Sequence, residues 1–160
     1  MIIDELIYDR TATDVSEVVA LAEAIKAGVA SPKQVQQYLS GTNKGAYGVS
    51  DLNRVETAVI YICEKLRNFG YTLVLTTVTD WSKEQLPAPR DFERYFANIA
   101  AIRAVLEAHK KSPPVPSSDI AKFGYVEANA VEQILVDTEE LLNRIAESWF
   151  FLNDIYSGEV

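Results

Sequence analysis

The sequence predicts a mainly α-helical protein, a helical bundle with a long C-terminal helix and a minor β element. Apolar residues recur every three or four positions along four segments, which places them on one face of a helix. A near seven-residue repeat favours the shallow crossing angles of a left-handed bundle. The clearest of these stripes lies near the middle of the chain: Leu52, Val55, Val59, Ile62, Leu66 and Phe69.

The first forty residues are predicted to contain an extended segment and two helices. Residues 2–8 form the extended segment. Thr13 or Asp14 then caps a helix that runs to about Lys26. A shorter helix follows over 31–39, with proline at its first position, where a missing N–H costs nothing.

The single strand candidate follows the third helix. Residues 41–49 are rich in turn formers and form a flexible connection. Ser50 caps the third helix and Gly70 ends it. Residues 71–79 are then almost entirely β-branched, aromatic or leucine, the composition of a strand. Its partner is either residues 2–8 or a strand from another copy of the chain.

Two helices and a proline-rich connection complete the prediction. Pro89 begins a helix that lasts to about His109. Residues 110–119 contain three prolines and form a second flexible connection. The last helix runs over about 125–153. The length of the whole chain, 1–160, suits one domain with a sizeable core.

Composition narrows the classes of partner and ligand. The net charge is -8. From Tyr125 onward the sequence contains eight acidic residues and one basic residue, Arg144. Nucleic acid is therefore excluded as a partner of that face. No run approaches the ~18 apolar residues of a membrane span and the start is not signal-like, so we expect no membrane partner and a protein that is cytoplasmic on synthesis.

Residues able to carry chemistry are scarce. Cys63 is the one cysteine and His109 the one histidine, so neither a disulfide framework nor a histidine-pair metal site can form. Glycine-rich phosphate loops and nucleophile-elbow motifs are missing. We therefore expect no cofactor, no metal and no enzymatic activity.

A short phrase of Asn and Glu three residues apart occurs twice, as Asn53 with Glu56 and as Asn129 with Glu132. Such a pair lets a helix form hydrogen bonds to its neighbour or to a loop, which fixes the register of an otherwise apolar contact. Arg54 would pair with an acid on a neighbouring helix. The sequence thus marks these five residues as register or assembly residues.

Consecutive aromatic residues near the C-terminus occupy every side of the last helix. One core cannot cover all of them. They meet either another chain or, alternatively, the N-terminal segment and the proline-rich connection. The candidate interface residues are Trp149, Phe150, Phe151, Leu152, Ile155 and Tyr156.

The run Asp51-Leu52-Asn53-Arg54-Val55-Glu56, followed by Tyr61-Ile62, resembles a helix that recurs in tail-associated proteins of phages and prophages of Gram-positive bacteria. Thr79-Asp80-Trp81, Glu93-Arg94-Tyr95 and Glu127-Ala128-Asn129-Ala130-Val131-Glu132 also resemble phrases of small proteins in such regions. The resemblance implies a structural component of a virion tail or baseplate, without enzymatic activity. It implies no catalytic residue.

Three hypotheses for function follow. The first is a phage or prophage structural protein that binds copies of itself and other structural proteins, and is incorporated into a virion or tail-like particle. The alternative is a cytosolic regulatory adaptor, unrelated to virions, that docks through its acidic last helix. The weakest is a small enzyme that uses Asp80, Glu56 or Glu132 as acid or base near Trp81, which would require a deep polar pocket that joins them.

Overall fold

The computed structural model describes residues 1–105 and 111–156, with side chains described as far as Trp149. Helices are the one kind of regular structure in this part of the chain, so the mainly α-helical prediction is confirmed there, as is the long C-terminal helix. Five α-helices and two short 3-10 helices (η) follow in this order: η1 (Ile2–Glu5), α1 (Ala12–Lys26), α2 (Pro32–Ser40), α3 (Val49–Asn68), α4 (Pro89–Val105), η2 (Ile120–Lys122) and α5 (Tyr125–Tyr156). The predicted helical residues 106–109 lie outside the described part.

All five α-helices begin in the same way. A side chain in the first turn accepts a hydrogen bond from the backbone N–H three residues earlier, at 2.7 to 2.9 Å. This satisfies an N–H that has no partner within the helix. The accepting residues are Asp14, Gln34, Asp51, Asp91 and Glu127.

Two predicted helix starts differ from the structure. The first helix is capped by Thr11, not by Thr13 or Asp14. The third is capped at Gly48, because the carboxylate of Asp51 reaches back to the Gly48 N–H. Ser50 lies inside the first turn, and its hydroxyl instead donates to the carbonyl of Gly41.

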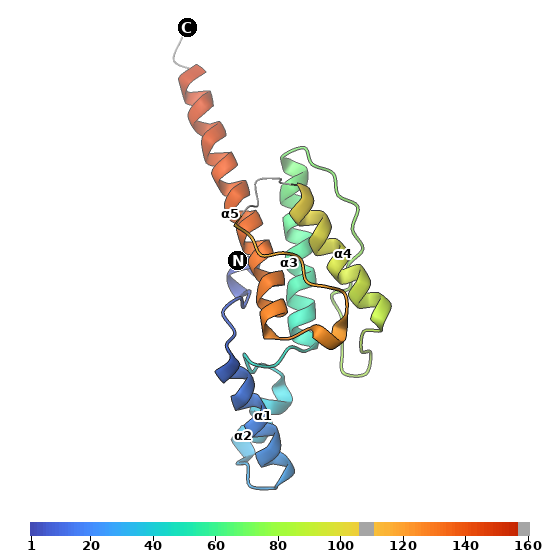
Figure 1. The fold of residues 1–160 in the computed structure, drawn as a ribbon. Helices are drawn as coiled ribbons and strands as arrows, with labels where there is room; N and C mark the ends of the chain where they lie inside the picture. Colours follow the sequence, from blue (N-terminus) through green and yellow to red (C-terminus); the bar gives the residue numbers. More distant parts are fainter. Residues whose placement is uncertain (106–110, 157–160) are drawn as a thin grey trace.

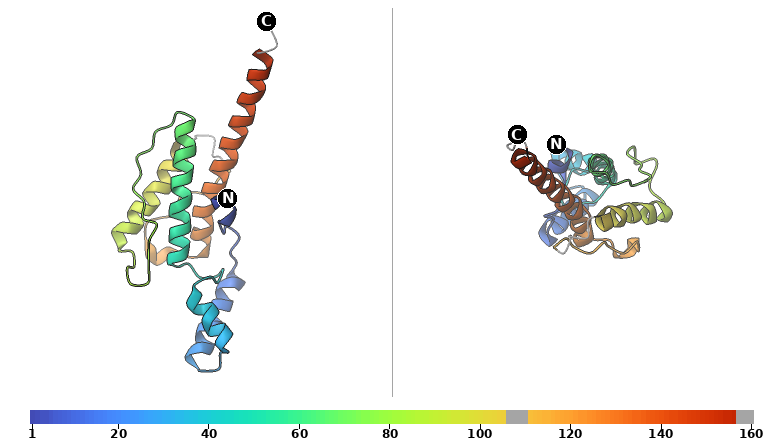
Figure 2. Two further views of the ribbon diagram at one scale, coloured as in Figure 1. Left: turned by 180° about the vertical axis from the view of Figure 1, so that it is seen from behind. Right: turned by 90° about the horizontal axis from the view of Figure 1, so that it is seen from above.

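Helices α3, α4 and α5 run side by side in the same direction (Figure 1). Parallel helices require connections that return along their whole length. Helix α3 has 20 residues and is therefore about 30 Å long, a distance that about nine extended residues cover. Residues 71–79 make this return outside α3 and α4 (Figures 1 and 2).

The predicted β element is wrong within this chain. Residues 71–79 have the composition of a strand but belong to none, and residues 2–8 begin with the 3-10 helix η1. The N-terminal segment packs on α3 and α5, whereas residues 71–79 lie over α3 and α4. Side chains of α3 and α4, rather than a second strand, bind the backbone of Thr76 and Val78.

The core lies between the three parallel helices. Its side chains are buried at the positions that the apolar stripes predict. Ile3 and Leu6, in and just after η1, cover one side of it. The fully buried apolar residues of the three helices include Val55, Ile62, Leu66, Ile99, Ile102, Ile134, Leu135 and Leu142.

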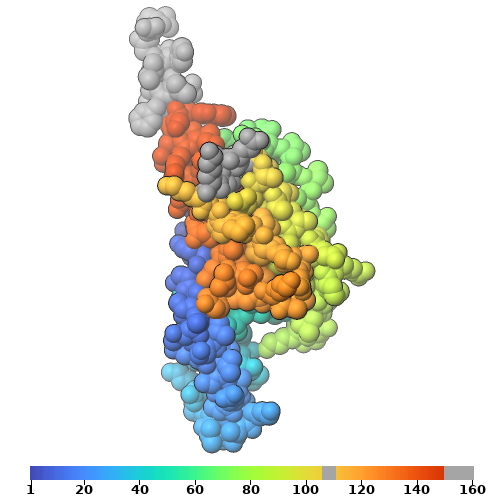
Figure 3. Space-filling view, viewed as in Figure 1, coloured from blue at the N-terminus to red at the C-terminus, as the bar shows by residue number. Residues whose placement is uncertain are grey.

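Helices α1 and α2 pack on each other and contribute no buried residue. They form a separate projection at the end of the molecule where α3 and α5 begin (Figures 1 and 3). The loop before α3 passes very close to the start of α1 at Gly45, where a Cβ atom would lie 2.0 Å from the carbonyl oxygen of Asp14. Only glycine permits that approach.

Candidate functional site: two Asn–Glu clamps and the end of the last helix

Asn129 and Glu132 of α5 hold the segment that precedes α1. The side-chain amide of Asn129 binds both backbone groups of Arg10, with 3.0 Å from the Arg10 N–H to Oδ1 and 2.9 Å from Nδ2 to the Arg10 carbonyl. Glu132 accepts the N–H of Ile7 at 2.6 Å. We call Asn129, Glu132 and the bound residues 7–10 the N-terminal clamp.

Asn53 and Glu56 of α3 hold a second segment in the same way. The amide of Asn53 accepts the Trp81 N–H at 2.8 Å and donates to the Trp81 carbonyl at 2.9 Å. Glu56 accepts the N–H of Val78 at 3.2 Å. We call Asn53, Glu56 and the bound residues 78–81 the central clamp.

The two clamps share one geometry. In each, the glutamate binds the N–H of a residue that lies three positions before the residue held by the asparagine. The bound segments also resemble each other: Ile7-Tyr8-Asp9-Arg10 and Val78-Thr79-Asp80-Trp81 both place a β-branched residue two positions before an aspartate. The repeated Asn-x-x-Glu phrase therefore corresponds to a repeated helix-and-segment contact.

The N-terminal clamp contains a buried cluster of four charges. Glu132 is fully buried and lies 2.8 Å from Arg10 and 3.0 Å from Arg54. Asp51 lies 2.9 Å from Arg10 and 2.6 Å from Arg54. Two acids and two guanidinium groups balance each other, as buried charges require.

The central clamp has its own arginine. Arg94 of α4 lies 2.5 Å from Glu56 and also donates to the carbonyl of Thr76 at 2.7 Å. Asn98 donates to the same carbonyl at 2.8 Å. The hydrogen bond to Glu56 raises the pKa of Arg94, so the guanidinium stays charged as the pH rises.

Neither Glu56 nor Glu132 has a free carboxylate oxygen in the part of the chain that the structure describes. Every carboxylate oxygen of Glu56 and Glu132 has a donor within 3.3 Å. A general base needs a lone pair directed at substrate. Asp80 is exposed and lies in the segment that the central clamp holds. The geometry favours a structural role for the carboxylates of Glu56 and Glu132.

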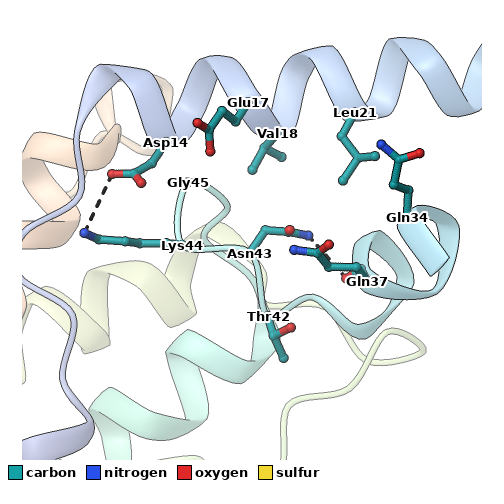
Figure 4. A pocket seen from close by; sticks show the side chains of 10 residues that line it. All are labelled: Asp14, Glu17, Val18, Leu21, Gln34, Gln37, Thr42, Asn43, Lys44 and Gly45. Atoms are coloured by element: carbon teal, nitrogen blue, oxygen red, sulfur yellow. Dashed lines mark hydrogen bonds and ion pairs between the residues drawn. The ribbon is translucent and has the colours of Figure 1, made fainter. Parts of the chain in front are cut away.

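Two cavities lie near the projecting helix pair. One, of about 380 Å³, lies between α1, α2 and residues 42–45, with polar side chains such as Gln37 and Asn43 directed into it (Figure 4). The other, of about 480 Å³, is lined mainly by apolar residues, among them Phe92 and Phe123. Neither is lined by Glu56, Glu132 or Asp80, so neither is the polar pocket that the enzyme hypothesis requires.

Tyr47 and Tyr95 join the loop before α3 to α4 through a 2.6 Å contact between their hydroxyls. Burial, with the neighbouring Tyr47, raises the pKa of Tyr95 well above its ordinary value. The unfolded chain loses this proton near pH 10, whereas the folded chain retains it. The contribution to stability is therefore complete below that pH and is lost as pH rises toward the folded pKa.

We expect the free energy of unfolding to fall above pH ~10 by up to about 1.4 kcal/mol per pH unit from Tyr95 alone. Urea denaturation from pH 8 to pH 11 measures this slope. Tyr95→Phe should make the slope shallower, although it also removes the partner of Tyr47. Tyr8→Phe, at a tyrosine that is 45% exposed, is the control. An unchanged slope in Tyr95→Phe would contradict the assignment.

The last helix extends beyond the three-helix core (Figures 1 and 2). Trp149 lies on this extension, is 55% exposed, and meets Phe69 with ring centroids 5.6 Å apart. The indole therefore packs against the ring of the residue that follows α3, and about half of its surface remains exposed. The remaining candidate interface side chains lie outside the described side chains: Phe150, Phe151, Leu152, Ile155 and Tyr156.

Sequence reasoning missed the partners of the two clamps. The sequence does not point to Arg10 or Asn98 as partners, and residues 78 and 79 fall within the predicted strand 71–79. The available signal is the recurrence of Ile-Tyr-Asp at 7–9 and Val-Thr-Asp at 78–80, each ahead of a helix. Arg54 is the exception, because it pairs with Glu132 of the neighbouring helix α5 as the sequence predicts.

The fold and the clamps define a class: in its described part the chain is all-α, with a core of three helices that point the same way, two of which hold an extended segment through Asn and Glu side chains. No protein-family model matches the chain, and no curated protein or solved structure is significantly similar to it. Among the described residues, no group of three His, Cys, Asp or Glu side chains could hold a metal ion. No helix in that part is both long and apolar enough to cross a membrane.

Proposed function

We propose that this chain is a non-enzymatic structural subunit of a phage or prophage tail or baseplate, and that it acts through protein–protein contacts. The resemblance of residues 51–62 and 127–132 to tail-associated proteins supports a place in a phage tail or baseplate. The observation that supports a protein–protein contact is the projecting end of α5, where Trp149 is 55% exposed and five of the next seven residues are apolar or aromatic.

An extension of this kind costs stability unless a partner covers it. Exposed apolar surface that continues along one element marks an interaction site in soluble proteins. Large aromatic side chains, tryptophan above all, supply most of the binding free energy at such sites. The fully engaged carboxylates of the clamps support the same view, because they leave the helices rigid rather than reactive.

The test is a double substitution, Trp149→Ala with Phe151→Ala. We expect it to weaken self-association, or binding to a tail protein from the same genome, by at least about tenfold, the scale of losing one or two aromatic anchors. The helical circular dichroism should stay within a few per cent of the parent chain. Light scattering after size exclusion, across a range of concentrations, measures the association.

The matched control removes exposed apolar side chains from another helix. Tyr38→Ala with Leu39→Ala acts on α2, where these residues are 38% and 59% exposed. It should leave association unchanged. A loss of helical signal in the Trp149 and Phe151 variant would show that these residues belong to the core and would overturn the proposal. A parent chain that stays monomeric and binds no tail protein would favour the regulatory adaptor.

A further inference from the structure

Residues 71–79 form the outer edge of the molecule beside α3 and α4 (Figures 1 and 2). Their exposure alternates as in an extended chain: Leu73, Leu75 and Thr77 are half-buried, whereas Thr72, Val74 and Thr76 are exposed. The half-buried side chains lie over α3, where they line a small cavity together with Val59 and Cys63. Val74 is 94% exposed.

From Thr72 to Val78 the backbone of this segment is bound on one edge only; just before it, the Tyr71 N–H donates to the Leu66 carbonyl of α3. Side chains of α3 and α4 bind the carbonyl of Thr76 and the N–H of Val78. In an extended chain, the N–H and C=O of every second residue point to the same edge. The backbone groups of Leu73, Leu75 and Thr77 therefore point to the opposite edge, and in the described part of the chain none of them has a hydrogen-bond partner.

We infer that this free edge is a pairing surface for the same segment of a second copy, in an antiparallel pair centred on Leu75. Leu75 would face Leu75, and Leu73 would face Thr77 in both directions. Each of these three pairs exchanges two backbone hydrogen bonds, which gives six across the contact. A two-fold axis through Leu75 makes the contact isologous, so that it closes at a dimer.

The side chains of the segment match this register. On the exposed face, Val74 of one copy would lie directly opposite Thr76 of the other, and Thr76 opposite Val74. Pairs of β-branched residues stabilise neighbouring strands. The devices that normally keep an edge from pairing, such as lysine, proline or a bulge, do not occur in residues 71–79.

Charge also selects a second copy at this place. The chain carries a net charge of -8, so two copies repel each other over most of their surfaces. Residues 71–79 contain no charged residue, and the repulsion is therefore weakest there. An extended peptide of another protein would meet the same backbone groups. The identical segment also places Val74 opposite Thr76 and Leu73 opposite Thr77.

The inference deepens the proposed function and rests on it, because it assigns one of the protein–protein contacts of the subunit. It differs in place, since the free edge lies on the return segment and not on α5. Variants of the two surfaces therefore separate the two proposals. Dimerisation that is lost in the Trp149 and Phe151 variant but kept in variants of residues 74 and 76 would overturn the edge and leave the proposed function standing.

The experiment uses two double variants of the full chain at the exposed positions. Val74→Lys with Thr76→Lys places lysine opposite lysine twice in the proposed register. Val74→Lys with Thr76→Glu places lysine opposite glutamate twice. Neither changes the backbone groups that α4 binds, so circular dichroism and urea denaturation should show an intact monomer for both. Sedimentation equilibrium measures the dimer dissociation constant.

We expect a concentration-dependent dimer for the parent chain, weakened at least about tenfold by the lysine pair and changed by less than about threefold by the lysine–glutamate pair. The lysine variant lowers the net negative charge, so general repulsion would predict the opposite order. A parent chain that stays monomeric to millimolar concentration, or two variants that dimerise equally, would overturn the inference.

Discussion

Glu132→Ala is expected to lower the free energy of unfolding by about 3–5 kcal/mol, the cost of leaving buried charges without their partner. Arg10 and Arg54 would each lose an ion pair, and the side chain of Arg10 is only 1% exposed. The N–H of Ile7 would lose its acceptor as well. Urea denaturation followed by circular dichroism measures the change.

Two further variants show whether the loss comes from the buried charge of Glu132. Glu132→Gln keeps an acceptor for the Ile7 N–H but removes the charge, so it should lie between the parent chain and the alanine variant. Glu140→Ala removes an acid of the same helix whose ion pair with Arg144 is exposed, and it should cost less than about 1 kcal/mol. Equal effects of Glu132→Ala and Glu140→Ala would show that the buried cluster is dispensable.

Leu135→Ala is expected to cost about 2–5 kcal/mol, because a fully buried leucine leaves a cavity that its neighbours fill only in part. Leu135 lies on α5 among the core residues of three helices, so the loss should destabilise the whole bundle. The midpoint of urea denaturation checks this. Leu39→Ala makes the same chemical change at a helical residue that is 59% exposed and should stay within about 0.5 kcal/mol. A similar loss in both would contradict the assignment of the core.

The apolar stripes were sufficient to predict the helices, since Val55, Ile62 and Leu66 are all buried at the expected spacing. Helix starts were harder. The sequence offers several capping residues in each stretch, and the chosen one depends on the first-turn side chain that reaches back. At α3 that side chain is Asp51, which selects Gly48 rather than Ser50.

The strand prediction failed for a different physical reason. The composition of 71–79 predicts extended backbone, which fits a return connection along a 20-residue helix. Composition does not say whether a neighbouring strand exists. In this chain, Glu56, Arg94 and Asn98 bind one edge of the segment, and their positions depend on the parallel arrangement of α3 and α4. The local sequence of residues 71–79 does not predict how α3 and α4 are arranged.

The candidate site was predictable in part. The repeated spacing of Asn53 with Glu56 and of Asn129 with Glu132 drew attention to the residues that form the clamps. Their partners lie 119 to 125 positions away in one clamp and 22 to 28 in the other. A helical pattern shows which face is polar, but not which loop reaches it.

The N-terminal clamp has a consequence for how the protein is made. Residues 7–10 leave the ribosome before Asn129 and Glu132, which bind them, are synthesised. Domains generally fold as units during synthesis, and contacts between distant residues form slowly. The newborn chain must therefore hold residues 7–10, with the charge of Arg10, in water until α5 appears. Closing the clamp then joins residues that lie 119 to 125 positions apart along the polypeptide.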